Sequence, residues 1–137
     1  MKTHTTNCIN TLIEVAEDTV ATGGEVPPTK GDAKSVAAMQ YNMISKHPYK
    51  YTSDDVLFTV YAERNGIKKE KLKEAREAFF SKGQACFRAS PLTKRYGWGV
   101  HSNAEGKIAI YGCDTQEYKK LQEDKSLKIV KAMRSSR

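Results

Sequence analysis

The chain has 137 residues, the size of one ordinary domain, and we expect a single domain over residues 1–137. Apolar residues make up 39% and charged residues 28%, a balance that closes a core and excludes wholesale disorder. No run approaches the roughly 18 to 20 apolar residues of a membrane span, and residues 1–10 lack a hydrophobic signal region. We therefore expect a soluble, unexported protein of the cytoplasm without a membrane partner.

The net charge of +7 is concentrated in the second half of the chain. Residues 1–77 carry equal numbers of basic and acidic residues, whereas residues 78–137 carry twelve basic and five acidic ones. Residues 78–104 contain no acid at all. An anionic partner, either a small molecule or a nucleic acid, would meet this half. For the C-terminal tail a solvated basic face is the favoured interpretation, because charge runs usually serve solubility.

The three cysteines, Cys8, Cys86 and Cys113, are far apart and form no Cys-x-x-Cys pair. This usage is typical of reduced thiols in a cytoplasm. No histidine stands at a metal-ligand spacing from a cysteine, so we expect neither a structural metal nor a cofactor. Cys86 precedes Arg88 closely enough for a nucleophilic role, but a small, half-buried strand residue is the favoured interpretation.

The first elements in chain order are a strand and a helix separated by a long loop. Alternating β-branched residues predict a strand over residues 10–16. Three glycines and two prolines predict a sixteen-residue loop over residues 17–32, either a binding loop or an extended crossover. Helical spacing of apolar residues predicts a helix over residues 33–46, capped by Asp32 and stopped by His47 and Pro48.

Two further helices are expected in the middle of the chain. The next helix starts at Thr52 or Ser53, where Thr52 and Asp55 have the spacing of a capping box, and it ends at Asn65. We assign the adjacent acids Asp54 and Asp55 to helix capping, because neighbouring helical residues diverge by about 100° and do not form an acid/base pair. A third amphipathic helix is expected over residues 68–82.

The second half of the chain supplies most of the expected strands. Period-two alternation predicts a strand over residues 84–90, ended by Pro91. Residues 97–101 and 107–111 predict a hairpin. A helix is expected over residues 115–122, and residues 124–133 fit either a helix or an edge strand over residues 128–133. The fold class is therefore α+β: a small antiparallel sheet, made of the C-terminal hairpin and the N-terminal and central strands, with three to five helices on one face.

The densest polar segment joins the strand over residues 84–90 to the hairpin. It offers guanidinium, ammonium and hydroxyl groups to a phosphate or carboxylate. The glycine spacing of a phosphate-binding loop is missing, and no residue is assigned a catalytic role. The candidate anion-binding residues are Arg88, Ser90, Thr93, Lys94, Arg95, Tyr96 and His101. The alternative is a tight loop whose basic side chains pair with acids from the first half.

Other functions stay open at this point. A small enzyme would use Cys86 or His101 beside the arginines, although a strand histidine without a carboxylate partner is usually a surface residue. Aromatic residues among basic ones are also typical of single-stranded nucleic-acid surfaces, but Trp98 shares a face with Ile108 and is expected in the core. An oligomer assembled through the C-terminal segment is the third alternative.

Several segments resemble a known family along the whole chain. They are the opening Met-Lys-Thr-His-Thr-Thr-Asn, Pro-Tyr-Lys-Tyr-Thr-Ser-Asp-Asp from residue 48, Phe-Ser-Lys-Gly from residue 80, Phe-Arg-Ala-Ser-Pro-Leu-Thr-Lys-Arg-Tyr-Gly-Trp-Gly from residue 87, and Val-Lys-Ala-Met-Arg-Ser from residue 130. The chain is similar here to a family of small bacterial proteins catalogued only as a domain of unknown function. The resemblance implies a stand-alone bacterial cytoplasmic protein and supplies no activity or site residue.

Overall fold

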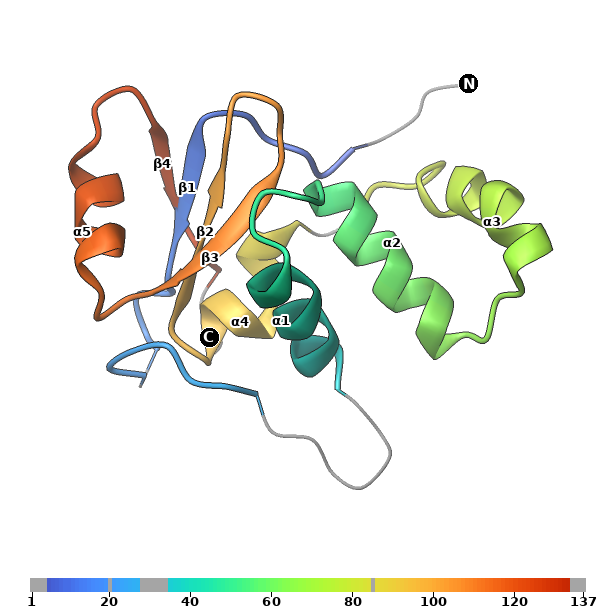
Figure 1. The fold of residues 1–137 in the computed structure, drawn as a ribbon, viewed down its shortest axis with the longest axis horizontal. Helices are drawn as coiled ribbons and strands as arrows, with labels where there is room; N and C mark the ends of the chain where they lie inside the picture. The colour runs from blue at the N-terminus through green and yellow to red at the C-terminus, as the bar shows by residue number, and fades with distance from the viewer. Residues whose placement is uncertain (1–4, 20, 28–34, 85, 134–137) are drawn as a thin grey trace.

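A computed structural model describes residues 5–19, 21–27, 35–84 and 86–133 of the chain. Its four strands form one mixed sheet in the order β3-β2-β1-β4 (Figure 1). The strands are β1 (Thr11–Glu14), β2 (Trp98–Ser102), β3 (Ile108–Gly112) and β4 (Lys128–Lys131). β1 pairs antiparallel with β2 and parallel with β4, and β2 pairs antiparallel with β3. The first strand in sequence therefore lies between strands from the end of the chain.

Five helices accompany the sheet, so the predicted α+β class is confirmed. They are α1 (Val36–Lys46), α2 (Ser53–Arg64), α3 (Leu72–Phe79), α4 (Pro91–Lys94) and α5 (Gln116–Glu123). Single 3-10 turns, η1 (Lys69–Lys71) and η2 (Phe87–Ala89), precede α3 and α4. No described helix is long and apolar enough to cross a membrane.

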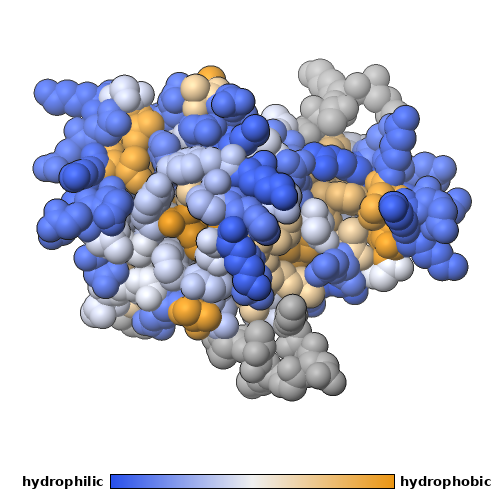
Figure 2. All heavy atoms as spheres, viewed as in Figure 1, coloured by the Kyte–Doolittle hydropathy of each residue, from blue (hydrophilic) through white to orange (hydrophobic). Residues whose placement is uncertain are grey.

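The main core lies on the sheet face that carries Ile13 and Val100, which are paired in the β1–β2 register. α1, α2 and η2 bury side chains against this face, among them Ile44, Val56 and Phe87. A second apolar cluster joins α2 to α3 around Phe58, Ala62 and Phe80. Figure 2 shows apolar side chains at the surface where these two helices meet, as one of several apolar patches on this face.

The opposite face of the sheet is covered by α5, so the expectation of helices on one face only was wrong. Tyr118 of α5 is 3% exposed and accepts a hydrogen bond from the backbone N–H of Val15 at 3.1 Å. A Cβ atom at Gly99 would overlap the Tyr118 ring. A glycine at the centre of β2 thus permits the close approach of α5.

Several predicted elements are confirmed, including the hairpin of β2 and β3 and the helix α5. At the start of α2, the Thr52 hydroxyl accepts from the Asp55 N–H, and the Asp55 carboxylate accepts from the Thr52 N–H, both at 3.1 Å. This is the predicted capping box. Of the two alternatives for the C-terminal segment, the edge strand is the one observed, as β4.

The strand predicted over residues 84–90 was wrong. Gln84 and Cys86 lie in irregular backbone, and Phe87–Ala89 form η2. Ser90 is the N-cap of α4, with Pro91 in its first turn, so Pro91 begins a helix where a strand end was expected. The sheet consequently has no central strand from this segment. The parallel β1–β4 pair makes it mixed, where an antiparallel sheet was expected.

The expected first helix begins later than predicted, at Val36, because Ser35 caps it by accepting the Ala38 N–H at 3.1 Å. The predicted cap Asp32 lies outside the described residues. The described part of the predicted loop, residues 17–19 and 21–27, contains no strand or helix. It is tied to the start of β2, since the Glu25 carbonyl accepts the Trp98 indole N–H at 2.7 Å.

Candidate functional site

The structure divides the predicted anion-binding residues into separate environments. Ser90 and Thr93 are 4% and 0% exposed. The Ser90 hydroxyl donates to Gln40 Oε1 at 2.6 Å and accepts from the Leu92 N–H. The Thr93 hydroxyl donates to the Phe87 carbonyl at 2.6 Å. Both hydroxyls are therefore occupied by partners inside the protein and hold η2 and α4 in place.

The basic members of the predicted set also diverge. Arg88 is exposed, and its Nε donates to the Lys131 carbonyl at 2.7 Å, which fixes it at the end of β4. Lys94 ends α4 and the exposed Arg95 follows it. Tyr96 packs its ring against the core. Of these four residues, Arg88 alone belongs to the pocket described next.

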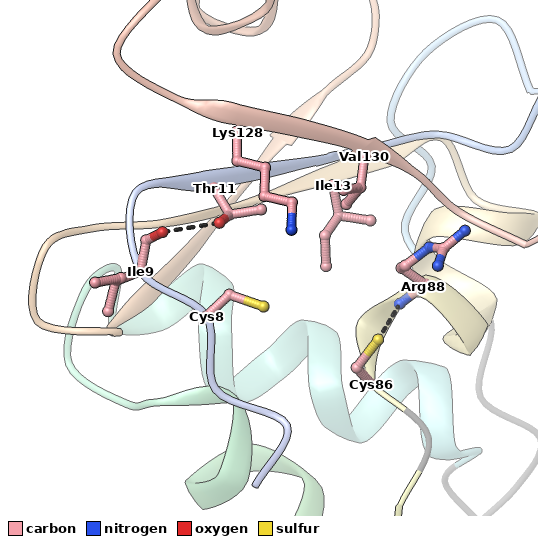
Figure 3. A pocket seen from close by; sticks show the side chains of 8 residues that line it. All are labelled: Cys8, Ile9, Thr11, Ile13, Cys86, Arg88, Lys128 and Val130. Carbon is pink, nitrogen blue, oxygen red and sulfur yellow. Dashed lines mark hydrogen bonds between the residues drawn. The ribbon is translucent and has the colours of Figure 1, made fainter.

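A pocket of about 380 Å³ lies between β1, β4 and η2 (Figure 3). We call it the thiol pocket; its lining residues are Cys8, Ile9, Thr11, Ile13, Cys86, Arg88, Lys128 and Val130. The parallel register pairs Thr11 with Lys128 and Ile13 with Val130, so these side chains share one sheet face. The pocket thus combines two thiols and two cations with an apolar wall.

The N-terminal segment is held in place by a buried carboxylate of α2. Asp54 is 8% exposed and accepts three hydrogen bonds, from the Thr5 hydroxyl at 2.6 Å and from the Thr6 N–H and hydroxyl, each at 2.7 Å. The Asp54 N–H in turn donates to the Asn7 side chain. These bonds position Cys8, the next residue, at the pocket. Asp54 therefore anchors the segment, in addition to lying in the first turn of α2.

The electrostatics of the thiol pocket are set by its cations. Figure 3 shows the Lys128 side chain extending toward Cys8, whereas the Arg88 guanidinium turns toward the end of β4. Among the described residues, neither cation forms a salt bridge with a carboxylate. Burial raises the pKa of the Cys8 thiol, and the nearby Cys86 raises it further, while Lys128 lowers it. Cys8 accordingly stays protonated at neutral pH.

Cys86 meets a different environment in the same pocket. Its sulfur accepts a hydrogen bond from the Arg88 backbone N–H at 3.4 Å, at the start of η2. Figure 3 shows both cysteine side chains extending into the space between β1 and η2. Sequence reasoning singled out Cys86 and Arg88 together but missed Cys8 and Lys128, because these come from opposite ends of the chain. The parallel pairing of β1 with β4 brings them together, and no local pattern signals it.

A family model described as a family of unknown function, DUF6157, matches residues 3–137. The chain belongs to DUF6157. No curated protein and no solved structure matches it. Family membership therefore brings no activity, ligand or fold neighbour, and the site of this DUF6157 chain is interpreted from its own geometry.

His101 lies on the opposite sheet face from the thiol pocket of the DUF6157 chain. It pairs with Leu12, the neighbour of the pocket residues Thr11 and Ile13, so its side chain points to the other side. The sheet itself separates His101 from Cys86. The structure therefore forms no direct Cys86–His101 pair, and an enzyme that uses either residue beside the arginines stays a prediction.

His101 instead belongs to a hydrogen-bonded group with two tyrosines. The Tyr49 hydroxyl lies 2.8 Å from His101 Nδ1 and 2.7 Å from the Tyr111 hydroxyl. Tyr49 adopts a φ of 60°, an uncommon conformation for a residue with a side chain. Burial lowers the pKa of His101, an effect that Asp124 partly offsets. This group reaches around the edge of β3, where the Tyr49 N–H donates to the Ile108 carbonyl.

No described residues of the DUF6157 chain form a group of three or more histidine, cysteine or acidic side chains that could hold a metal ion.

The predicted core position of Trp98 fits its packing against the main cluster, where its ring lies 5.4 Å from the Tyr41 ring between centroids. Other pockets lie around Tyr61 and Phe79 of α2 and α3, each with one cation in its lining; the thiol pocket differs from them in combining two cations with two thiols.

Proposed function

We propose that this chain is a small binding protein that takes up an anionic small molecule in the thiol pocket. Lys128 and Arg88, both exposed lining residues, supply the two cations of the pocket. The observation that carries the proposal is the presence of these two cations, without carboxylate partners among the described residues, around one pocket. A cation that no acid neutralises is available to a ligand carboxylate or phosphate.

The remaining lining narrows the class of ligand. Ile9, Ile13 and Val130 give the pocket an apolar wall, and its volume suits a small molecule rather than a polymer. The Thr11 hydroxyl donates its proton to the Ile9 carbonyl at 2.8 Å, so this donor is already used within the protein. We therefore favour a short aliphatic carboxylate or phosphate ester, with its charged end at Lys128 and its chain along the apolar wall.

Calorimetric titration with butyrate, butyl phosphate and inorganic phosphate tests this proposal. Trp98 is not among the pocket residues, so calorimetry is a better readout than its fluorescence. Lys128→Met is expected to weaken binding by about ten- to hundredfold, the range for one charge-assisted hydrogen bond. The matched control is Lys125→Met, which removes an exposed lysine of the preceding turn. Equal effects of the two substitutions would refute a site at Lys128.

The patch predicted from the sequence is a competing location for the anion. Its cations, the half-buried Lys94 and the exposed Arg95, lie at the end of α4, next to Tyr96 in the sequence. Lys94→Met combined with Arg95→Met separates the two locations, because these residues do not line the pocket. Loss of binding in this variant, with Lys128→Met unchanged, would move the site to α4. A single-stranded RNA oligonucleotide in the same titration tests nucleic acid as the partner, with affinity that falls steeply with salt.

We also propose that the chain acts as one domain in a bacterial cytoplasm. Its three cysteines are free and half-buried, which suits a reducing compartment. Binding without hydrolysis of the anion is the favoured form of the proposal, because the sheet separates Cys86 from His101. Turnover of butyl phosphate to free phosphate during the titration would overturn this part of it.

A further inference from the structure

Two of the three cysteines of the chain line one pocket. Cys8 comes from the segment before β1 and Cys86 from the residue before η2, and both are free and half-buried. Figure 3 shows the two side chains extending into the same space. The third cysteine, Cys113, follows β3 and does not line the pocket. Two thiols from distant parts of the sequence therefore share a pocket with two cations, and the third thiol does not line it.

The two thiols of the pocket differ in their surroundings. The Cys86 sulfur accepts a hydrogen bond from the Arg88 backbone N–H at 3.4 Å. The Cys8 thiol donates to the Thr6 carbonyl at 4.0 Å between Sγ and O, and no backbone N–H of the described residues donates to this sulfur. Lys128 is close enough to Cys8 to influence its titration. The pocket thus pairs a sulfur that accepts a hydrogen bond with a sulfur that donates one.

We infer that Cys86 and Cys8 form a peroxide-reactive thiol pair. The Cys86 thiolate attacks one oxygen of a small hydroperoxide, the O–O bond breaks, and Cys86 becomes a sulfenic acid. The departing alkoxide or hydroxide takes up a proton, in a pocket whose Lys128 ammonium stabilises its charge. Cys8 then attacks the Cys86 sulfur, a disulfide forms, and water leaves with the Cys8 proton. Two thiols are oxidised, the peroxide is reduced, and an external dithiol restores the pair.

This chemistry goes beyond the proposed anion binding and does not depend on it. The anion site needs Lys128 and Arg88, whereas the thiol pair needs the two sulfurs. Cys8→Ser combined with Cys86→Ser keeps both cations in place, so its titration with butyl phosphate tests the anion proposal alone. Peroxide reactivity of the unsubstituted chain, measured without any anion, tests the thiol pair alone.

The experiment uses the full, reduced chain, which is treated with hydrogen peroxide or cumene hydroperoxide and then alkylated and mapped by mass spectrometry. We expect a Cys8–Cys86 disulfide, and oxidation of Cys86 on the order of tenfold faster than that of Cys113. Cys8→Ser is expected to leave a Cys86 sulfenic acid that dimedone traps, and Cys86→Ser to abolish the fast reaction. Cys113→Ser is the matched control and should behave as the unsubstituted chain does.

Two results would overturn the inference. One is oxidation of Cys86 at the same rate as Cys113, which would show that the pocket confers no special reactivity. The other is oxidation of Cys86 without any Cys8–Cys86 disulfide, which would show that Cys8 does not resolve the product. Circular dichroism of each serine variant confirms that the fold is retained, so that a lost reaction reports on the sulfur removed.

Discussion

Removal of the Asp54 carboxylate should release the N-terminal segment from the thiol pocket. Asp54 accepts three hydrogen bonds of 2.6–2.7 Å from Thr5 and Thr6. In Asp54→Ala the buried Thr6 N–H loses its partner, which costs about 1–3 kcal/mol, and the Thr5 hydroxyl loses a charged acceptor. The Thr6 hydroxyl keeps the Ser53 hydroxyl at 2.8 Å. The expected loss of unfolding free energy is therefore about 2–4 kcal/mol.

The conservative variant sharpens this prediction. In Asp54→Asn the amide oxygen can replace Oδ1, which accepts both Thr6 bonds, so only the Thr5 bond to Oδ2 is lost. We expect Asp54→Asn to lower the free energy of unfolding by about 1 kcal/mol. Glu63→Gln, which changes an exposed carboxylate on the same helix, is the control and should stay within about 0.5 kcal/mol of the unsubstituted chain.

Two assays test the role of Asp54. Urea unfolding measures the free energy of unfolding of each variant. In thermal unfolding, a loss of about 2–4 kcal/mol corresponds to a drop in Tm of roughly 6–12 °C for a chain of this size. The rate at which Cys8 reacts with Ellman's reagent reports the position of the segment, and we expect at least about a tenfold increase in Asp54→Ala. An unchanged Cys8 rate together with a full loss of stability would show that Asp54 stabilises α2 without positioning Cys8.

Three further predictions concern elements that support the site. Gly99→Ala should lower the free energy of unfolding in urea by about 1–3 kcal/mol, because the new methyl group overlaps the Tyr118 ring. If Gly99→Ala lowers it by the same amount in a chain that also carries Tyr118→Ala, the overlap is not the cause. Burial lowers the pKa of His101, so its contribution to stability is full above about pH 6.5 and is lost as the pH falls below that value. The free energy of unfolding in urea should differ less between pH 7.5 and pH 5.0 for His101→Gln than for the unsubstituted chain. Equal pH differences in the two proteins would show that His101 does not cause the loss of stability at low pH. Thr52→Ala should lower the free energy of unfolding by about 1 kcal/mol, because it removes the capping box of α2. In thermal unfolding, the control Ser45→Ala, which changes an exposed residue of α1, should show no measurable change.

Local patterns were sufficient to predict the elements whose signals lie within a few residues. The Thr52 and Asp55 spacing identified the start of α2, and the alternation of Trp98 and Val100 identified β2. The strand predicted over residues 84–90 failed because a short alternating run also fits a 3-10 turn that buries Phe87. Ser90 followed by Pro91 is a helix-start signal, and it outweighed the alternation.

The candidate site was predictable only in part, for a physical reason. Arg88 and Cys86 are close in sequence and were singled out together, whereas their neighbours Cys8 and Lys128 depend on the pairing of β1 with β4. Such long-range pairing is decided by tertiary packing and leaves no periodic signal. The hydroxyls of Ser90 and Thr93 could not be distinguished from ligand groups by residue type, because their internal partners are set by the same packing.

The strand order also determines when the fold can form during synthesis. β1 is translated well before its two neighbours in the sheet, β2 and β4. Both edges of β1 therefore stay unpaired until β2 and β4 have been made, and the sheet can be completed only after β4 has left the ribosome. A chain truncated after Asp124 lacks β4 and therefore leaves one edge of β1 unpaired. We expect this truncated chain to aggregate through the open edge.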